Sequence, residues 1–306
     1  MTDLVIRPLA AGEQHRFAEL PDPSFVGIAW TGRDYAQGLA KNEYRPEWTW
    51  AALRGDRVVA RAAWWGGPDD ADPINLDWFD FGDDTEAGVA LLQGAPFTCE
   101  YCLVLPPAWR EDPVVREEGQ RRIDVSVQAG MRVLVERIRF RWTPADGLPA
   151  RPDRLEYRPC DDDAMLDAIR RVHVGTLDAH ARAQAAREGA EAAALEDLKI
   201  LRWFPGPRED WRLAYTPDGT PDGELAGLTV PTRNHTSPVI GLIGVVPERR
   251  GHGYGLDLLA EATHMLAERG AQEVIGETDF GNEPMAAAFR KAGYQVTQER
   301  VFLTWQ

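Results

Sequence analysis

The clearest pattern in the chain is an apolar run that ends in a glycine-rich turn and continues as an amphipathic segment. Residues Ile240 to Val246 are almost wholly apolar, with β-branched side chains and glycines, which is typical of a strand covered on both faces. Leu256 to Glu268 carries apolar residues at helical spacing. The intervening residues, Arg249 to Gly255, read RRGHGYG. The pattern therefore predicts a buried strand, a basic turn and a helix in direct succession.

A second pattern is internal repetition. The sequence from Ala129 to Trp142 matches that from Ala292 to Trp305 at six positions of identical spacing: Ala, Gly, Val, Glu, Arg and Trp. The starts of the halves also match, because LVIRPL near the N-terminus resembles RLEYRP from Arg154. Self-similarity at fixed spacing over half a chain indicates two copies of one architecture.

Each half reads as a strand, one or two helices, an antiparallel strand pair, a central strand, helix, strand, helix and final strand. The strand pairs turn at Gly55-Asp56 and around Pro217 to Gly223, and the second half adds a long alanine-rich helical segment, Ala179 to Leu201. We predict an α+β (mixed α/β) fold of two tandem domains, each a mostly antiparallel mixed sheet flanked by helices. The domains span residues 1–143 and 154–306, and the Pro/Gly-rich residues 144–153 form an exposed linker.

The turn at Arg249 to Gly255 has the chemistry of an anion site. Alternating glycines let the backbone approach a ligand closely, and the N-terminus of the following helix adds partial positive charge, so phosphate is the best-suited ligand. A dinucleotide fingerprint would place GxGxxG directly after the strand, whereas here the spacing is GxGxG after Pro247, Glu248 and two arginines. A Walker loop would end in Gly-Lys-Ser/Thr, and this turn does not.

Arg250, Gly253 and Gly255 match the R/Q-x-x-G-x-G/A turn of motif A, so the C-terminal half resembles the GCN5-related N-acetyltransferases. The resemblance implies that acetyl-CoA is the co-substrate and that this turn holds its pyrophosphate. A second element, similar to motif B, contains Asn282, Met285 and Phe289. The predicted cofactor-binding residues are Val245, Val246, Arg250, Gly251, His252, Gly253, Tyr254, Gly255, Asn282, Met285 and Phe289.

The N-terminal half differs at the corresponding turn. Its central strand, Ile74 to Phe81, runs into Gly-Asp-Asp-Thr-Glu at Gly82 to Glu86 instead of an arginine-glycine turn. These carboxylates would repel a pyrophosphate, and Thr85 or Asp84 would cap the next helix. We therefore expect this half to be a degenerate copy that binds no CoA and serves as a scaffold or as one wall of the acceptor pocket.

The catalytic groups are less determined by the sequence. Phe289 stands where the resemblance implies a tyrosine as general acid, and phenylalanine has no proton to give. Tyr254 is a candidate acid in its place. Glu277, at the end of the strand Glu273 to Thr278, is the candidate base, with Asp279 as the weaker alternative. His173 and His180 flank the region that covers the acceptor in this fold, and each is more simply interpreted as a structural imidazole.

Composition narrows the class of partner. The net charge of -15 argues against nucleic-acid binding, which needs a basic face, and suits a neutral or cationic acceptor. No apolar run reaches membrane-spanning length and the N-terminus does not resemble a signal peptide, so we expect a cytoplasmic protein. Three cysteines, with the CxxC inside the strand-like FTCEYCLVL, indicate buried thiols and no metal site.

The sequence therefore predicts a CoA-dependent N-acetyltransferase that moves an acetyl group to a small-molecule amine by direct attack in a ternary complex. Two alternatives stay open. The chain can be a non-catalytic acyl-CoA-binding regulatory module, which the phenylalanine at 289 favours, or an N-acetyltransferase of proteins or peptides.

Overall fold

The computed structural model describes residues 3–217 and 223–306 and divides into two compact units. Unit 1 comprises Met1–Glu136 together with Gln298–Gln306, and unit 2 comprises Arg137–Thr297. Each unit is a mostly antiparallel mixed sheet with flanking helices, so the predicted α+β class is confirmed.

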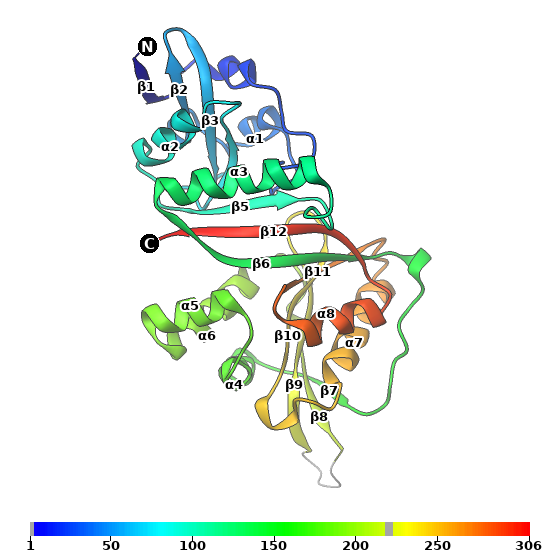
Figure 1. Ribbon diagram of the computed structural model, residues 1–306. Helices are drawn as coiled ribbons and strands as arrows, with labels where there is room; N and C mark the ends of the chain where they lie inside the picture. The colour runs from blue at the N-terminus through cyan, green and yellow to red at the C-terminus, as the bar shows by residue number, and fades with distance from the viewer. Residues whose placement is uncertain (1–2, 218–222) are drawn as a thin grey trace. The chain divides into compact units, whose positions relative to one another are not determined.

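Unit 2 has the strand order β6-β11-β10-β9-β8-β7. Helices α4, α5 and α6 cover one face of its sheet, and α7 and α8 cover the other (Figure 1). The neighbouring strands in this order are antiparallel except β10 and β11, which are parallel. The elements are β6 Met131–Trp142, η3 Pro144–Asp146, β7 Glu156–Pro159, α4 Asp162–His173, α5 Ala179–Glu188, α6 Ala190–Trp203, η4 Arg208–Asp210, β8 Arg212–Thr216, β9 Glu224–Arg233, β10 Pro238–Val245, η5 Pro247–Arg249, α7 Tyr254–Glu268, β11 Val274–Asp279, α8 Glu283–Lys291 and β12 Gln295–Trp305.

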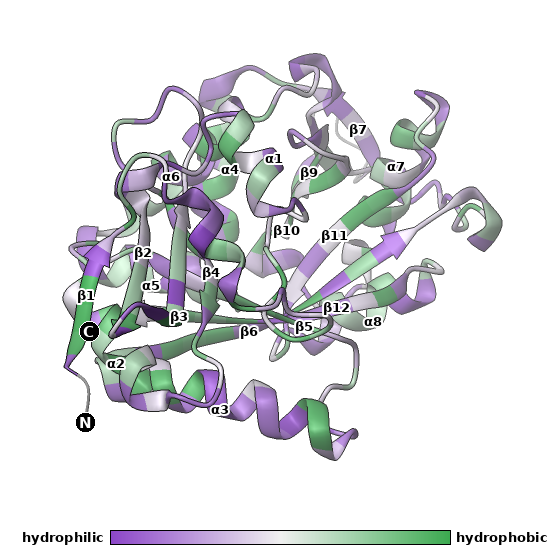
Figure 2. Ribbon diagram, turned by 90° about the horizontal axis from the view of Figure 1, so that it is seen from above, coloured by the Kyte–Doolittle hydropathy of each residue, from purple (hydrophilic) through white to green (hydrophobic). Residues whose placement is uncertain are grey.

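Unit 1 repeats this design with the strand order β1-β2-β3-β4-β5-β12. Here β4 and β5 are the parallel pair. Hydrophilic and hydrophobic residues alternate along α3, as expected of a helix that covers a sheet with one face (Figure 2). The elements are β1 Leu4–Pro8, η1 Gln14–Glu19, α1 Tyr35–Ala40, η2 Pro46–Trp48, β2 Thr49–Arg54, β3 Arg57–Trp65, β4 Asn75–Asp80, α2 Thr85–Gly94, β5 Glu100–Leu105 and α3 Pro113–Ala129.

The final strands of the two halves are exchanged. The C-terminal strand β12 pairs with β5 in unit 1, where Arg300 lies opposite Val104. The strand β6, from the first half of the chain, pairs with β11 in unit 2, where Arg141 lies opposite Ile275. The compact units therefore differ from the predicted ranges 1–143 and 154–306, because each half supplies the last strand of the other unit's sheet.

The predicted linker, residues 144–153, is attached to unit 2 rather than free. The indole of Trp142 donates to the carbonyl oxygen of Gly147 at 2.7 Å, and the Arg151 guanidinium binds the Glu261 carboxylate of α7 at 2.7 and 2.9 Å. The predicted helix Ala179 to Leu201 is two helices, because Gly189 breaks it with a φ of 94°. The turn predicted at Pro217 to Gly223 falls mostly outside the described residues, although β8 and β9 pair as expected on either side of it.

The Gly55-Asp56 turn is present between β2 and β3, with Gly55 at a φ of 63°. The predicted strand FTCEYCLVL is shorter than expected, because β5 comprises EYCLVL alone: Cys102 is buried in it, whereas Cys99 precedes it and is half-buried. Among residues 3–217 and 223–306, no helix combines the length and apolarity needed to cross a membrane.

Candidate functional site

The candidate site of unit 2 begins where β10 and β11 part. Their parallel register contains a single pair, Val239 with Ile275, at the start of both strands. On its other edge β10 stays paired with β9 along its whole length, to Val245 opposite Gly227. Beyond Val239 the edge of β10 that faces β11 therefore separates from its neighbour, which leaves backbone groups for another hydrogen-bonding partner.

The direction of those backbone groups follows from one hydrogen bond. The N–H of Val246 donates to the carbonyl oxygen of Ala226, the residue before Gly227 of β9, at 3.0 Å. Because successive N–H groups of a strand point to opposite sides, the N–H groups of Val245 and Ile243 point away from β9. These two groups face the opening between β10 and β11. An extended ligand that carries amides can pair with them as an added strand would.

The glycine-rich turn follows directly and supplies the anion site. Gly251 and Gly253 have φ values of 85° and 80°, a region that disfavours side chains with a Cβ. Gly253 is the N-cap of α7, and no side chain caps this helix. Within the described part of the chain, no acceptor binds the backbone N–H groups of residues 251–255. Successive unpaired N–H groups at the positive end of a long helix form a binding site for phosphate.

Space around the turn is open. A Cβ at Gly251 would meet nothing within 4 Å, and one at Gly255 would lie 4.0 Å from the sulfur of Met285. Met285 belongs to α8, so the structure brings the two motifs recognised in the sequence together. Asn282 is the N-cap of α8, as expected of a residue that holds this helix. Gly255 of the turn and Met285 of α8 are therefore neighbours, and Asn282 begins the helix that carries Met285.

The guanidinium of Arg250 is held by the backbone on both sides of the turn. Its guanidinium donates to three backbone carbonyl oxygens: Val245 at 3.1 Å, Val172 at 2.8 Å and Gly175 at 3.0 Å. The side chain thus ties the turn to the end of β10 and to the C-terminal end of α4. The structure assigns Arg250 to positioning the turn, which the motif spacing alone did not reveal.

Phe289 is a core residue rather than part of the cofactor site. It is 2% exposed and stacks on Phe140, with ring centroids 4.7 Å apart. It has almost no surface to offer a ligand. Tyr294 also lies in this core, and its hydroxyl is hydrogen-bonded to that of Thr263. Burial raises the pKa of Tyr294 above its usual range.

The candidate catalytic side chains are all engaged. Glu277 on β11 accepts from the guanidinium of Arg139 on β6 at 2.9 Å, a cross-strand partner that the sequence did not reveal. Asp279 is buried, pairs with Arg137, and accepts from the N–H of Ala179 at the start of α5. Asp279 is therefore structural.

The remaining candidates, Tyr254 and His173, have different surroundings. Tyr254 opens α7, and its ring lies 5.8 Å from that of the exposed His252, so it belongs to the phosphate end of the site. His173 is paired with Asp197 at 2.8 Å, which fits the structural interpretation.

Comparisons with known proteins agree with this geometry. Residues 180–294, which include the opening, the turn and α8, match the family model described as "Acetyltransferase (GNAT) family". This part of unit 2 is therefore similar to a GNAT domain. A "Mycothiol acetyltransferase" from Clavibacter sepedonicus is 35% identical over 74 residues, which is 24% of this chain and 24% of that protein. The matched segment thus spans about a quarter of the curated relative.

Solved structures support the fold over the whole chain. A GCN5-related N-acetyltransferase from Sphaerobacter thermophilus has a TM-score of 0.57 at 16% identity and covers 98% of this chain and 94% of its own. A GNAT-family acetyltransferase from Colwellia psychrerythraea has a TM-score of 0.52 at 10% identity, over 99% and 100% of the two chains. At identities this low, the structural similarity shows a shared fold.

Unit 1 has the same parting of strands as unit 2, but its own chain fills the opening. The parallel strands β4 and β5 share only two register pairs, Asn75 with Glu100 and Leu76 with Tyr101. Beyond them, the N–H of Gly27 donates to the carbonyl oxygen of Val104 on β5 at 2.8 Å. The N–H of Trp30 and the hydroxyl of Thr31 donate to Asp77 on β4. The segment Val26–Thr31 therefore bridges the two strands.

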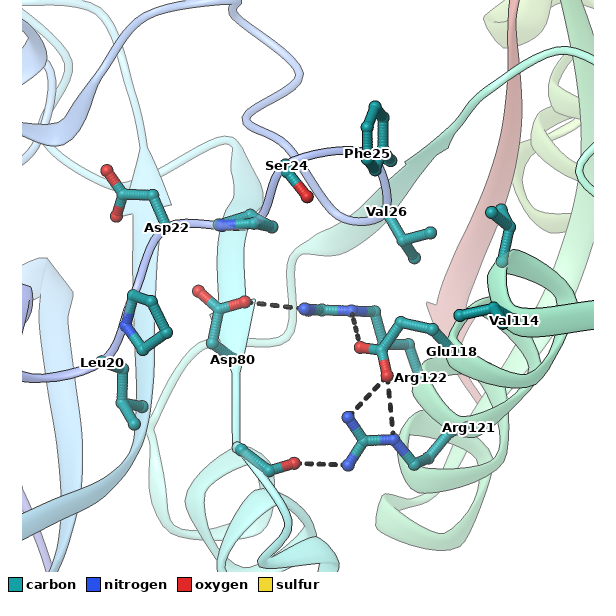
Figure 3. A pocket seen from close by; sticks show the side chains of 14 residues that line it. Leu20, Asp22, Ser24, Phe25, Val26, Asp80, Val114, Glu118, Arg121 and Arg122 are labelled. Carbon is teal, nitrogen blue, oxygen red and sulfur yellow. Dashed lines mark hydrogen bonds and ion pairs between the residues drawn. The ribbon is translucent and has the colours of Figure 1, made fainter.

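Arg122 closes the rest of this opening from α3. Its guanidinium donates to Asp80, as Figure 3 shows, and to the carbonyl oxygen of Phe79. Asp80 also accepts from Arg61 at 2.9 Å. All three charged side chains are buried. What remains is a pocket of about 340 Å³ with this network in its wall. The backbone of Phe79 is thus already hydrogen-bonded within the chain.

The acidic turn of unit 1 is partly compensated by one arginine. Arg54 binds Asp84 at 2.7 Å and Glu86 at 2.9 Å, and it holds the pKa of Asp84 below its usual range. Asp84 also caps α2, as predicted, by accepting from the N–H of Ala87. Three carboxylates against one guanidinium leave the turn acidic, and the filled strand opening adds a steric obstacle to a phosphate-bearing ligand.

Proposed function

We propose that unit 2 binds acetyl-CoA and transfers its acetyl group to an amine acceptor. The observation that carries the proposal is the continuous path from the β10 edge at Ile243 and Val245 to the unpaired N–H groups of residues 251–255. An amide-bearing arm that ends in a pyrophosphate has complementary groups at both ends of this path. The GNAT match and the similarity to a mycothiol acetyltransferase segment support acyl transfer as the chemistry.

The residues of the path then have separate roles. The turn holds the phosphates, Met285 packs beside Gly255, and the N–H groups of β10 hold the arm and donate to the thioester oxygen as it gains negative charge. The acceptor nitrogen forms the new C–N bond, the C–S bond breaks, CoA leaves as a thiolate that takes a proton from water, and the amine proton passes to a base. We assign the base to Glu277, a carboxylate held by Arg139 at 2.9 Å. Tyr254 lies at the turn, which does not suit an acid for the sulfur.

We further propose that unit 1 binds no acyl-CoA. The segment Val26–Thr31 and the Arg122–Asp80–Arg61 network already use the strand opening that unit 2 leaves free. The cofactor then binds once per chain, and titration of the protein with CoA yields a stoichiometry of one.

Replacement of Gly253 by valine tests the cofactor site. A β-branched side chain at a φ of 80° fills the approach to the N–H groups, and the loss of two charge-assisted hydrogen bonds lowers CoA affinity by roughly 100-fold or more. Gly270 offers a matched control, because it follows the other end of α7 with a φ of 84° and also has open space around it. Gly270→Val bears the same backbone strain and keeps CoA affinity. Equal CoA binding by both variants, measured by calorimetry, would contradict the assignment.

Turnover separates the enzyme from a non-catalytic acyl-CoA-binding module. The core position of Phe289, which leaves the site without the expected tyrosine, is the observation in favour of the module. A panel of amines, including amino sugars, polyamines and peptide N-termini, is tested with acetyl-CoA and release of free CoA thiol as the readout. Turnover with a small amine supports the proposal, turnover with peptides alone supports a peptide N-acetyltransferase, and tight binding without turnover supports the module.

A further inference from the structure

A cation from the segment before β7 lies against the glycine turn of unit 2. The guanidinium of Arg154 donates to the carbonyl oxygen of His252 at 3.0 Å and to Oδ1 of Asp257 at 2.8 Å, and its Nη2 lies 2.7 Å from Oδ2 of the same carboxylate. It also lies 5.1 Å from the centre of the Tyr254 ring, and its Nη2 is 3.7 Å from the Cβ position of Gly253. Arg154 therefore contacts the turn and the first turn of α7 together.

The hydrogen bond to His252 sets the direction of the neighbouring N–H. In a trans peptide the carbonyl of one residue and the N–H of the next point in opposite directions. Because the His252 carbonyl points to Arg154, the N–H of Gly253 points to the other side. That N–H has no partner among the residues described. Arg154 thus orients one donor of the phosphate site without occupying it.

The ion pair removes a charge that would oppose the ligand. Asp257 is 2% exposed and stands in the first turn of α7, where the helix N-terminus would attract a phosphate. An unpaired carboxylate at that depth would repel an anion through poorly screened medium. Arg154 pairs with it, and half of the arginine side chain stays exposed.

We propose that Arg154 is a positioning residue of the pyrophosphate site: it orients the Gly253 N–H and neutralises Asp257. The inference rests on the proposed acetyl-CoA site of unit 2. It adds a residue outside both sequence motifs, 98 positions before the carbonyl that it binds.

Four variants test this role by calorimetry with CoA, and with inorganic pyrophosphate as a phosphate-only probe. Arg154→Ala weakens CoA binding by roughly tenfold to 100-fold, because a charge-assisted contact is lost and Asp257 is unmasked. Arg154→Lys keeps the positive charge but lacks the paired N–H donors of the guanidinium, and it binds CoA better than Arg154→Ala does. Adding Asp257→Asn to Arg154→Ala restores about threefold or more of the lost affinity, because the buried charge is gone.

Arg151→Ala is the matched control. Arg151 comes from the same segment and binds the same helix at Glu261 and Glu268, away from the turn. It therefore tests whether anchoring of the segment alone matters, and CoA affinity stays within about twofold of the wild-type value.

The outcomes separate this inference from the proposed function. Equal CoA affinity of Arg154→Ala and Arg151→Ala, or no recovery in the Arg154→Ala/Asp257→Asn double variant, overturns the role of Arg154. Failure of the wild-type protein to bind CoA overturns the proposed function itself, and the role of Arg154 with it.

Discussion

The ring of Phe289 lies directly over Gly276. A Cβ at Gly276 would be 2.4 Å from Cε1 of Phe289, so only a glycine on β11 allows α8 to approach this closely. The same point lies 3.6 Å from Ile240 of β10. Phe289 therefore packs at the closed end of the strand opening, where β10 and β11 still pair.

Phe289→Tyr tests whether the missing tyrosine limits the chemistry. The hydroxyl would be buried at the closed end without a partner, which costs about 1–3 kcal/mol of unfolding free energy. We expect lower stability in urea unfolding and no gain in kcat. A substantial rise in kcat would show that the hydroxyl reaches the sulfur and that this position retains the role of a general acid.

The exchange of final strands predicts that two substitutions in β12 damage different units. Val301 is 1% exposed and packs in the core of unit 1, whereas Val296 packs against the core of unit 2. Val301→Asp buries an unpaired charge and is expected to destabilise unit 1 by several kcal/mol.

Hydrogen exchange read by mass spectrometry locates the damage. Val301→Asp lowers protection in residues 4–136, although the substitution lies near the C-terminus, and leaves unit 2 protected. Val296→Asp, five positions away on the same strand, lowers protection in unit 2. If both variants lost protection in unit 2 alone, β12 would complete the sheet of the C-terminal half and the final strands would not be exchanged.

The assignment of Glu277 as base predicts a loss of rate in Glu277→Gln. A general base contributes about 10²–10⁴-fold, so kcat falls by about 100-fold or more while the affinity for CoA is kept. The acidic limb of the pH–rate profile disappears with the titrating group. The matched variant Arg139→Gln keeps the carboxylate and therefore keeps a pH-dependent limb. If Glu277→Gln retains kcat within about twofold, its pair with Arg139 is structural only.

Asp77 predicts a pH dependence of stability in unit 1. Burial raises its pKa, although Tyr44, Thr31 and Trp30 all donate to it. The folded protein therefore holds this proton more tightly than the unfolded chain, whose aspartates titrate near about 3.9. Its contribution to stability is fullest in acid and is lost as the pH rises through the folded-state value.

Asp77→Asn removes that titration. The free energy of unfolding of the wild type, minus that of Asp77→Asn, is expected to fall as the pH rises above the unfolded-state value of about 4 in urea unfolding. Asp83→Asn, at an exposed carboxylate of the same unit, serves as the control and shows no such trend. If this difference in unfolding free energy stays level or rises with pH, the hydrogen bonds that Asp77 accepts affect its pKa more than burial does.

The sequence predicted most elements and the location of the cofactor turn because those features are local. The apolar run from Ile240, the glycines 251, 253 and 255, and the helix after them all lie in one stretch, and backbone preference is readable over such lengths. It did not reveal that Phe289 packs in the core or that the Arg250 guanidinium binds backbone carbonyl oxygens. In both cases the deciding contacts come from distant segments: Phe140 and Gly276 for Phe289, and the end of α4 for Arg250.

By itself the sequence determined that two copies of one fold are present and that the second copy carries the glycine turn. Tertiary structure decided which final strand completes which sheet. The segments ending at Trp142 and Trp305 share the same pattern of hydrophobic and polar residues. Each of them could therefore serve as the last strand of each sheet. Tertiary structure also decided why unit 1 is closed, because the Gly27–Val104 and Arg122–Phe79 hydrogen bonds join residues more than 40 positions apart. Local pattern specifies an element and its faces, whereas its partners are selected only when the whole chain packs.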